Sequence, residues 1–150
     1  MIDVPRDDMV VMLEAGYIYL AMKKFTEAKK VFEGVTTLVP KHDIPQVALA
    51  NVYFAQGKFL ESIRTLKQAL KDNPQSAFAW SHLGESQLFY GKRDEALESL
   101  KKASHFEPKG KSGDFARALI ELIDQGYDPK KFKKAHEKGI KAMTEDKVAG

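Results

Sequence analysis

The sequence predicts an all-α protein, a superhelix of three helix–turn–helix repeats followed by C-terminal capping helices. Three observations predict this fold. Pro40, Pro74 and Pro108 are spaced by 34 residues, and each follows a stretch in which apolar residues recur at helical spacing. Small and large side chains recur at fixed distances from these prolines. The segment after the last proline again has helical spacing, so it extends the array.

Equivalent positions of the three repeats carry similar side chains. Three sets show this agreement: Ala28, Ser62 and Ala96; Phe32, Leu66 and Leu100; Val35, Ala69 and Ala103. On the first helix of each repeat, a small residue lets the second helix approach closely, at Gly16, Ala50 and Gly84. Gly57 and Gly91 fall at the turn between the two helices, where glycine accepts a positive φ. Five large residues are interpreted as filling the space beside the small ones: Tyr19, Phe25, Tyr53, Phe59 and Trp80.

The three repeats are expected at 9–42, 43–76 and 77–110, after an N-terminal arm of residues 1–8. Each repeat contributes two helices, with expected bounds 9–22 and 25–38, 43–56 and 59–72, and 77–90 and 93–106. Asp43 and Ser76 are the predicted N-caps of the first helices of repeats two and three, because their side chains accept hydrogen bonds from helix N–H groups.

A stack of helix pairs leaves an apolar face at its end, and a capping helix is expected to cover it within 9–126. Asp114 is its predicted start and Gly126 its stop, and its apolar residues are Phe115, Ala118, Leu119, Leu122 and Ile123. A second, basic helix is expected within 127–150. It should begin at Asp128-Pro129, carry Phe132, Ala135, Ile140 and Met143, and fray at its end.

These residues resemble the tetratricopeptide repeat, whose 34-residue pattern combines an early Trp, a Leu-Gly pair, a Tyr, and later Ala, Phe, Ala and Pro. The third copy matches best, with Trp80, Leu83, Gly84, Gly91, Ala96, Leu100, Ala103 and Pro108. The departures are Gln87 in place of Tyr, Ser62 and Val35 in place of Ala, and Lys23 at the turn. The resemblance implies a superhelix whose first helices line a concave face that binds an extended peptide or a partner helix.

The positions that the resemblance places on the concave face are mostly apolar or aromatic. They are Val10, Leu13, Tyr17 and Leu20 in repeat one; Ile44, Val47, Asn51 and Phe54 in repeat two; and Phe78, Ser81, Glu85, Leu88 and Phe89 in repeat three. We expect the apolar members to form pockets for a partner segment and Asn51 to hydrogen-bond its backbone. The alternative for each residue is burial in the core, since a periodic stripe usually means burial.

Two subfamilies can be compared at these positions. Family members that hold the acidic tail of heat-shock chaperones use a clamp of lysine, asparagine and arginine. The corresponding positions here are Leu13, Tyr17, Ala48, Phe78 and His82, so that function is not expected. The size and the apolar groove are similar to type III secretion chaperones that guard hydrophobic translocator proteins. Those chaperones usually carry an N-terminal dimerisation helix, whereas eight residues precede repeat one here.

The chain offers no set of residues typical of an active site. Cysteine is absent, and the four histidines lack metal-ligand spacing such as HExxH. No GxSxG, P-loop or GxGxxG sequence occurs, and Glu95 and Glu98 are interpreted as part of a charged surface with Lys101 and Lys102. The prediction is a protein that is not an enzyme and needs no cofactor, metal or small-molecule substrate.

Composition supports one ordinary soluble domain, with 43% hydrophobic and 30% charged residues. No secretory signal or membrane-spanning run is found, so a cytoplasmic protein is expected. The net charge of +3 comes entirely from residues 109–150. Four lysines there, Lys130, Lys131, Lys133 and Lys134, suggest an anionic partner surface, although nucleic acid and membrane are not the favoured partners.

The main hypothesis is therefore a non-catalytic adaptor or chaperone that binds an extended hydrophobic segment of another protein in the concave groove. The alternative is a self-associating scaffold, a homo-oligomer whose groove is filled by its own N-terminal arm or its C-terminal helix.

Overall fold

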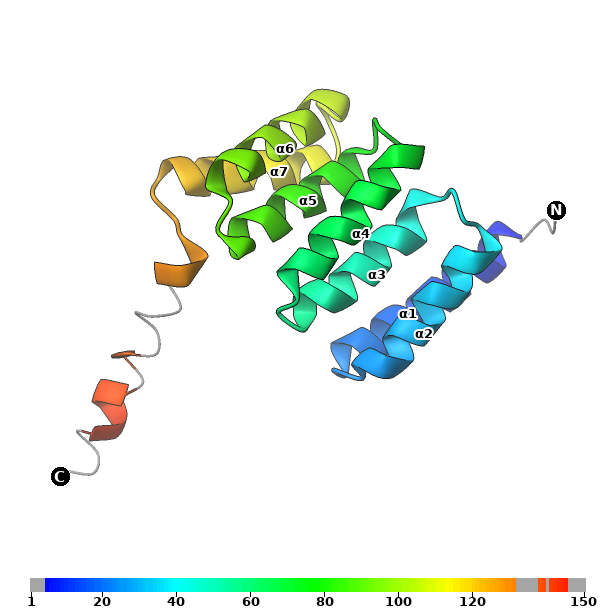
Figure 1. Ribbon diagram of the computed structural model, residues 1–150, viewed down its shortest axis with the longest axis horizontal. Helices are drawn as coiled ribbons and strands as arrows, with labels where there is room; N and C mark the ends of the chain where they lie inside the picture. The colour runs from blue at the N-terminus through cyan, green and yellow to red at the C-terminus, as the bar shows by residue number, and fades with distance from the viewer. Residues whose placement is uncertain (1–4, 132–137, 140, 146–150) are drawn as a thin grey trace.

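The computed structural model describes residues 5–131, 138–139 and 141–145. Its described part contains no strand, and seven helices precede Gln125: α1 (Arg6–Ala21), α2 (Phe25–Leu38), α3 (Asp43–Ala55), α4 (Phe59–Asp72), α5 (Ala77–Tyr90), α6 (Arg93–Phe106) and α7 (Lys111–Asp124). The first six form three antiparallel hairpins stacked in one direction, and α7 packs on the last hairpin (Figure 1). The predicted all-α superhelix is confirmed, although α1 begins at Arg6 instead of residue 9.

The hairpins build two layers of helices. The first helices α1, α3, α5 and α7 each contact the next one, whereas α2, α4 and α6 contact only the first helices on either side of them. A layer whose members touch must lie inside a curve, and a layer whose members are spread apart must lie outside it. The first helices therefore line the concave side, as expected, and we call this side the inner face.

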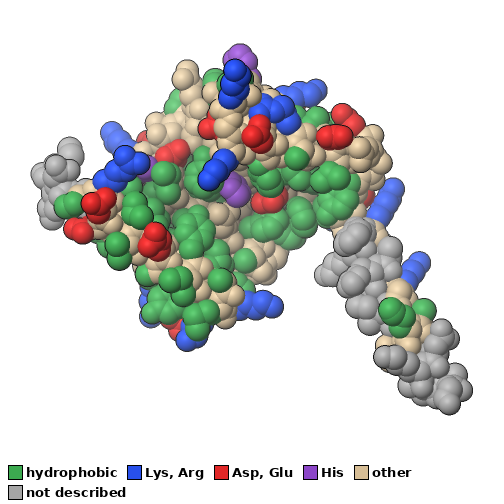
Figure 2. Space-filling view, turned by 180° about the vertical axis from the view of Figure 1, so that it is seen from behind, with side chains coloured by type: hydrophobic (Ala, Val, Ile, Leu, Met, Phe, Trp, Pro, Cys, Tyr) green, Lys and Arg blue, Asp and Glu red, His purple; other side chains and the backbone are tan. Residues whose placement is uncertain are grey.

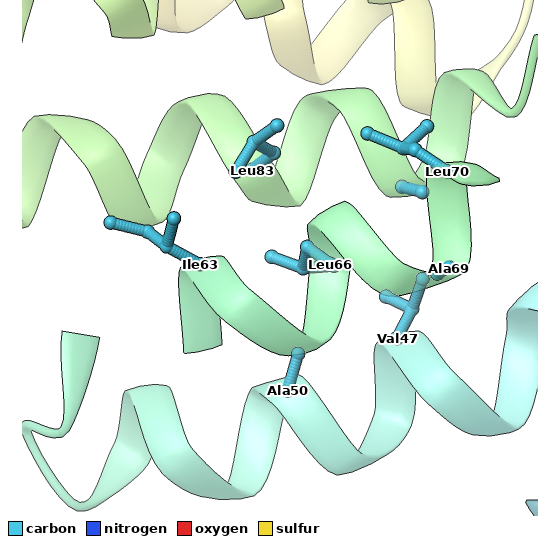
Figure 3. Packing of buried hydrophobic residues seen from close by; sticks show 8 residues of the cluster. Val47, Ala50, Ile63, Leu66, Ala69, Leu70 and Leu83 are labelled. Carbon is cyan, nitrogen blue, oxygen red and sulfur yellow. The ribbon is translucent and has the colours of Figure 1, made fainter. Parts of the chain in front are cut away.

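The core depends on a small residue of one helix facing a large residue of the next. Phe32, Leu66 and Leu100 are fully buried at equivalent positions of the second helices. A Cβ atom on Gly16 would lie 2.3 Å from Cε1 of Phe32, and one on Gly84 would lie 2.6 Å from Cγ of Leu100. In the middle repeat, Leu66 lies between α3 and α5, as Figure 3 shows. The close approach of the helices therefore explains the recurring small residues.

Two departures from the repeat pattern, Ser62 and Gln87, form buried hydrogen bonds. Ser62 Oγ of α4 lies 2.8 Å from Ser86 Oγ of α5, and both side chains are buried. Ser99 Oγ of α6 donates to Gln87 Oε1 of α5 at 2.6 Å. Since a buried polar group is costly only without a partner, these pairs let polar residues occupy core positions.

The turns between the helices confirm the role expected for glycine. Gly57 and Gly91 have φ of 75° and 98°. Lys23 occupies the same place in the first repeat with φ of 58°, and it is the one non-glycine residue with positive φ in the described part of the chain. The first hairpin thus keeps the turn geometry at a steric cost that the other two avoid.

One of the two predicted N-caps is confirmed and the other is wrong. Ser76 caps α5, because its Oγ accepts a hydrogen bond from the backbone N–H of Ala79 at 3.1 Å. The N-cap of α3 is His42, whose Nδ1 accepts from the N–H of Ile44 at 3.3 Å. Asp43 is instead the first helical residue, and its carboxylate accepts a 2.6 Å hydrogen bond from Ser76 Oγ. Asp43 thereby connects the starts of α3 and α5.

The array ends in a helix that begins earlier than predicted. α7 starts at Lys111, so Asp114 lies in its first turn, and Gly126 follows its end with φ of 91°. Its residues Ala116, Leu119 and Ile123 complete the core over α6. Ala118 and Leu122, expected in the same apolar face, are exposed.

The chain becomes helical again at Pro129, where the N–H of Lys130 donates to Asp128 Oδ1 at 2.9 Å, as the predicted start at Asp128-Pro129 requires. Residues 138–139 and 141–145 are helical, and Met143 is exposed. Phe132, Ala135 and Ile140 lie outside the described residues. Within the ranges described, none of the helices has the length and apolar character needed to cross a membrane.

Candidate functional site

The 34-residue period places equivalent residues of α1, α3 and α5 side by side in rows across the inner face. The row nearest the helix starts consists of Val10, Ile44 and Phe78, and it stays accessible. Val10 is 40% exposed, Ile44 is also exposed, and Phe78 is half-buried against the middle core cluster. These three predicted site residues therefore form an apolar row that a partner can reach.

The next accessible row consists of Tyr17, Asn51 and Glu85 and is polar. Asn51 Nδ2 donates a long hydrogen bond of 3.4 Å to Tyr17 Oη. Burial raises the pKa of the Tyr17 phenol, with the hydrogen bond from Asn51 opposing the shift, so the phenol is neutral at physiological pH. A contact of the Asn51 amide with a partner backbone, the role predicted for it, must compete with this weak bond.

Three predicted pocket residues are core residues instead. Leu13 and Val47 occupy one row with Ser81, and all three are buried, as is Leu88. Each first helix has neighbours on two sides, so one position in every turn must face an adjacent helix. The pocket role predicted for Leu13, Val47 and Leu88 is therefore wrong, and the alternative of burial holds. Leu20 and Phe54 are half-buried at the ends of α1 and α3.

A pocket of about 1060 Å³ opens at the edge of the array where the hairpin turns lie. We call it the edge pocket. The start of α4, the end of α5 and the segment after α7 line it with Gly57, Lys58, Phe59, Leu60, Glu61, Phe89, Tyr90, Tyr127, Pro129 and Lys130. Two rings of its wall, Phe59 and Phe89, pack against each other and against Phe54, with ring centroids 5.0 to 5.6 Å apart. Phe54 meets both other rings edge-to-face, a favoured arrangement of aromatic pairs that helps hold this apolar wall in place.

The structure brings the predicted site residues Phe54 and Phe89 together, with neighbours that the sequence does not identify. The period predicts Phe59 only as a space-filling residue and does not point to Tyr90 or Tyr127. The signal available for this wall is the aromatic residue repeated just after the turn, at Phe25 and Phe59. The return of residues 127–130 to this edge is a long-range contact that no local pattern encodes.

Charges stand at the rim of the edge pocket. Lys58 and Lys130 supply positive charge and Glu61 negative charge. A Cβ atom on Gly91 would lie 2.8 Å from Lys130 Nζ, so this ammonium sits beside the C-terminal end of α5, where the helix dipole favours a cation. Lys131 is exposed, whereas Lys133 and Lys134 lie outside the described residues. The anionic surface proposed for these four lysines stays a prediction.

A smaller hollow of about 220 Å³ lies at the opposite end of the inner face, between the starts of α5 and α7. The ring of His82 lies between Phe78 and Phe115, at centroid distances of 5.0 and 5.8 Å. Its Nδ1 approaches Glu85 Oε1 at 3.5 Å. Figure 2 shows hydrophobic side chains gathered over one face of the molecule, with Lys, Arg, Asp and Glu side chains among them.

The described residues contain no group of three or more His, Cys, Asp or Glu that could hold a metal ion. None of the five positions compared with the heat-shock clamp carries a lysine or arginine: Leu13, Tyr17, Ala48, Phe78 and His82. The inner face therefore offers apolar contact and scattered hydrogen bonds.

Residues 19–79 match the family model described as the tetratricopeptide repeat. A peroxisomal targeting signal receptor of Kluyveromyces lactis is 26% identical over 103 residues, which are 69% of this chain and 17% of the receptor. The chain thus spans a small part of that relative.

Two solved structures have a similar fold. The first tetratricopeptide domain of Spaghetti (RPAP3), bound to the HSP90 peptide SRMEEVD, is 22% identical with a TM-score of 0.68, covering 84% of this chain and 98% of that one. The type III secretion translocator chaperone SycD of Yersinia enterocolitica, in an alternative dimer, is 16% identical with a TM-score of 0.71, covering 83% and 98%. At these identities the likeness concerns the fold.

Proposed function

The chain is a tetratricopeptide repeat protein, and on this premise we propose that it is a non-catalytic adaptor that binds an extended apolar segment of a partner protein. The observation that carries the proposal is the edge pocket of about 1060 Å³ with its aromatic wall. A concave pocket lined mainly by apolar side chains with few polar groups is the usual form of a binding site.

The geometry of the inner face suits an extended chain. Neighbouring helices pack about 8 to 10 Å apart, and an extended chain advances about 3.3 Å per residue. Apolar residues at about every third position of a partner segment would therefore meet successive members of the row Val10, Ile44 and Phe78. Beyond Phe78 the segment would turn along α5, and a large anchor residue about five to six residues further on would reach the edge pocket at the other end of that helix.

The test is site-directed photo-crosslinking at the proposed contacts. A benzoylphenylalanine is placed at Tyr90 in the edge pocket, at Ile44 in the row, or at Leu122 of α7 as an equally accessible control. We expect Tyr90 and Ile44 to crosslink one apolar segment of the same partner, and Phe89→Ala to reduce the yield at Tyr90 at least fivefold. Crosslinks of equal yield to unrelated proteins at all three positions would contradict the proposal.

A narrower proposal is that the partner is a hydrophobic secreted protein, as for type III translocator chaperones. The likeness to SycD and the scarcity of cations on the inner face support it. Co-expression with a translocator is expected to raise the amount of that translocator in the soluble fraction, and Phe89→Ala to abolish the gain. A translocator that stays equally insoluble with and without this chain would remove the narrower proposal while leaving the adaptor.

The alternative that the chain fills its own groove remains a second candidate. Residues 1–4, 132–137, 140 and 146–150 lie outside the described residues, and the edge pocket is open among those described. Removal of residues 1–5 or of 132–150 is expected to leave the crosslink yield at Tyr90 unchanged. A several-fold increase after either deletion would favour the self-filled groove.

A further inference from the structure

One side of α1 carries large apolar residues that are exposed in the described structure. Val11 is 63% exposed, Ile18 61% and Met22, just after the helix, 57%. In the later repeats the equivalent residues are buried under the preceding hairpin. The equivalents of Val11 are Pro45 and Ala79, and those of Ile18 are Val52 and Ser86. The first hairpin has no preceding repeat among the described residues. We call Val11, Ala15, Ile18 and Met22 the end face.

The spacing of the end face is that of a helix-pairing seam. Its four residues are separated by steps of four, three and four, the alternation of a and d positions in a coiled coil. They form a stripe about 16 Å long at 1.5 Å per residue. A straight stripe with this spacing fits another helix better than an extended peptide, and Ala15 at its middle allows the two helix backbones to approach closely.

The charges at the two ends of α1 identify the helix that fits. Asp7 and Asp8 lie in its first turn, and Lys23 and Lys24 follow its end. When two copies of α1 pair antiparallel, the acidic turn of each copy meets the lysines of the other, and the helix dipoles are opposed favourably. A parallel pairing would place like charges together. The stripe and its charges are thus complementary to themselves.

We propose that α1 pairs antiparallel with α1 of a second copy of this chain, through the end face, to form a two-fold symmetric dimer. In this pairing Val11 packs beside Met22 of the other copy, and Ala15 beside Ile18. Val10 and Tyr17 lie on the inner side of α1, so both inner faces remain open. The dimer presents two binding faces, and this raises the avidity for a partner that has two segments.

The first test measures the mass of the full chain by sedimentation equilibrium, up to about 100 µM, where interactions of micromolar strength saturate. We expect a mass that approaches twice the chain mass of 16.9 kDa. Val11→Glu and Ile18→Glu are expected to weaken association at least tenfold with unchanged helical circular dichroism. Leu122→Glu, at an exposed residue of α7, should leave the mass unchanged. A monomer at every concentration, or a dimer that Leu122→Glu disrupts and Val11→Glu does not, overturns the proposal.

The second test examines the antiparallel direction. Asp8→Lys and Lys23→Glu are each expected to weaken the dimer, by about two- to fivefold for each of the two symmetric charge pairs. The double variant Asp8→Lys/Lys23→Glu should recover the original affinity, since the pairs are restored with exchanged sign. Antiparallel pairing would be contradicted if the double variant lost as much dimer affinity as the two single losses predict together.

Adjacent valines separate this proposal from the adaptor function. Val10 and Val11 have the same side chain, but Val10 lies in the inner-face row and Val11 in the end face. Val10→Glu is expected to keep the dimer mass and to lower the crosslink yield at Ile44. Val11→Glu is expected to lower the mass to that of a monomer and to keep the crosslink yield at Ile44 for a partner that has a single binding segment. Failure of the first pattern counts against the adaptor function, and failure of the second against the dimer.

Discussion

At Gly16 the addition of a single carbon atom is expected to change the stability of the fold. A Cβ atom there would overlap the ring of Phe32, so Gly16→Ala is expected to lower the free energy of unfolding by about 1 to 3 kcal/mol. A methyl group on Gly34, in α2 of the same hairpin, would have nothing within 4 Å of it. Gly34→Ala should therefore raise the free energy of unfolding by about 0.5 to 1 kcal/mol, because alanine is the better helix former. Urea unfolding followed by circular dichroism measures the free energy of unfolding of both variants. Changes of the same sign would contradict the different packing of the two glycines.

The residue scale is also where the sequence predicts packing best and polar roles least well. Gly16, Gly84 and the residues opposite them follow from the period alone, because a small residue that recurs at one helix position indicates close helix packing. The choice between His42 and Asp43 as the N-cap depends on one backbone angle, which composition does not determine. The pairing of Ser62 with Ser86 is likewise a tertiary contact that the sequence pattern does not predict, since the two residues belong to different repeats.

At the scale of elements, Ser76 joins two first helices and starts one of them. Its Oγ accepts from the N–H of Ala79 and donates to the carboxylate of Asp43. Ser76→Ala removes both bonds and is expected to lower the free energy of unfolding by about 1 to 2 kcal/mol. Ser76→Thr keeps the hydroxyl and should change it by less than about 0.5 kcal/mol. Thermal unfolding compares the two variants, and equal losses would mean that the hydroxyl contributes nothing.

Helices could be predicted from the period, but the candidate site could only partly be predicted. Helical spacing identifies the apolar residues of a first helix, but it does not show whether their side faces the groove or a neighbouring helix. It therefore does not distinguish Val10, which faces the groove, from Val47, which faces the neighbouring helix. The edge pocket needs three elements to meet, one of them residues 127–130, so its position follows from tertiary contacts and not from any single helix.

Across the whole molecule, stability should be unequal from repeat to repeat. α5 contacts α3, α4, α6 and α7, whereas α1 contacts only α2 and α3 among the described helices. In a stacked array each element is stabilised by its neighbours, so α1 should open more often than α5. Hydrogen exchange at micromolar or lower protein concentration is expected to be at least tenfold faster for amides in the middle of α1 than in α5. Equal protection of the two helices would indicate that the array unfolds as one unit.

Ala118 and Leu122 on α7 are exposed, because no further helix covers this side of α7 among the described residues. One period after Ala96, where every earlier second helix has alanine or serine, the chain has Lys130. Lys130 is exposed, and its ammonium lies beside Gly91 at the end of α5. A long cationic side chain thus stands where the earlier second helices bury a small residue, so this segment does not repeat the packing of α2, α4 and α6, although Ala118 of α7 keeps the small residue of a first helix.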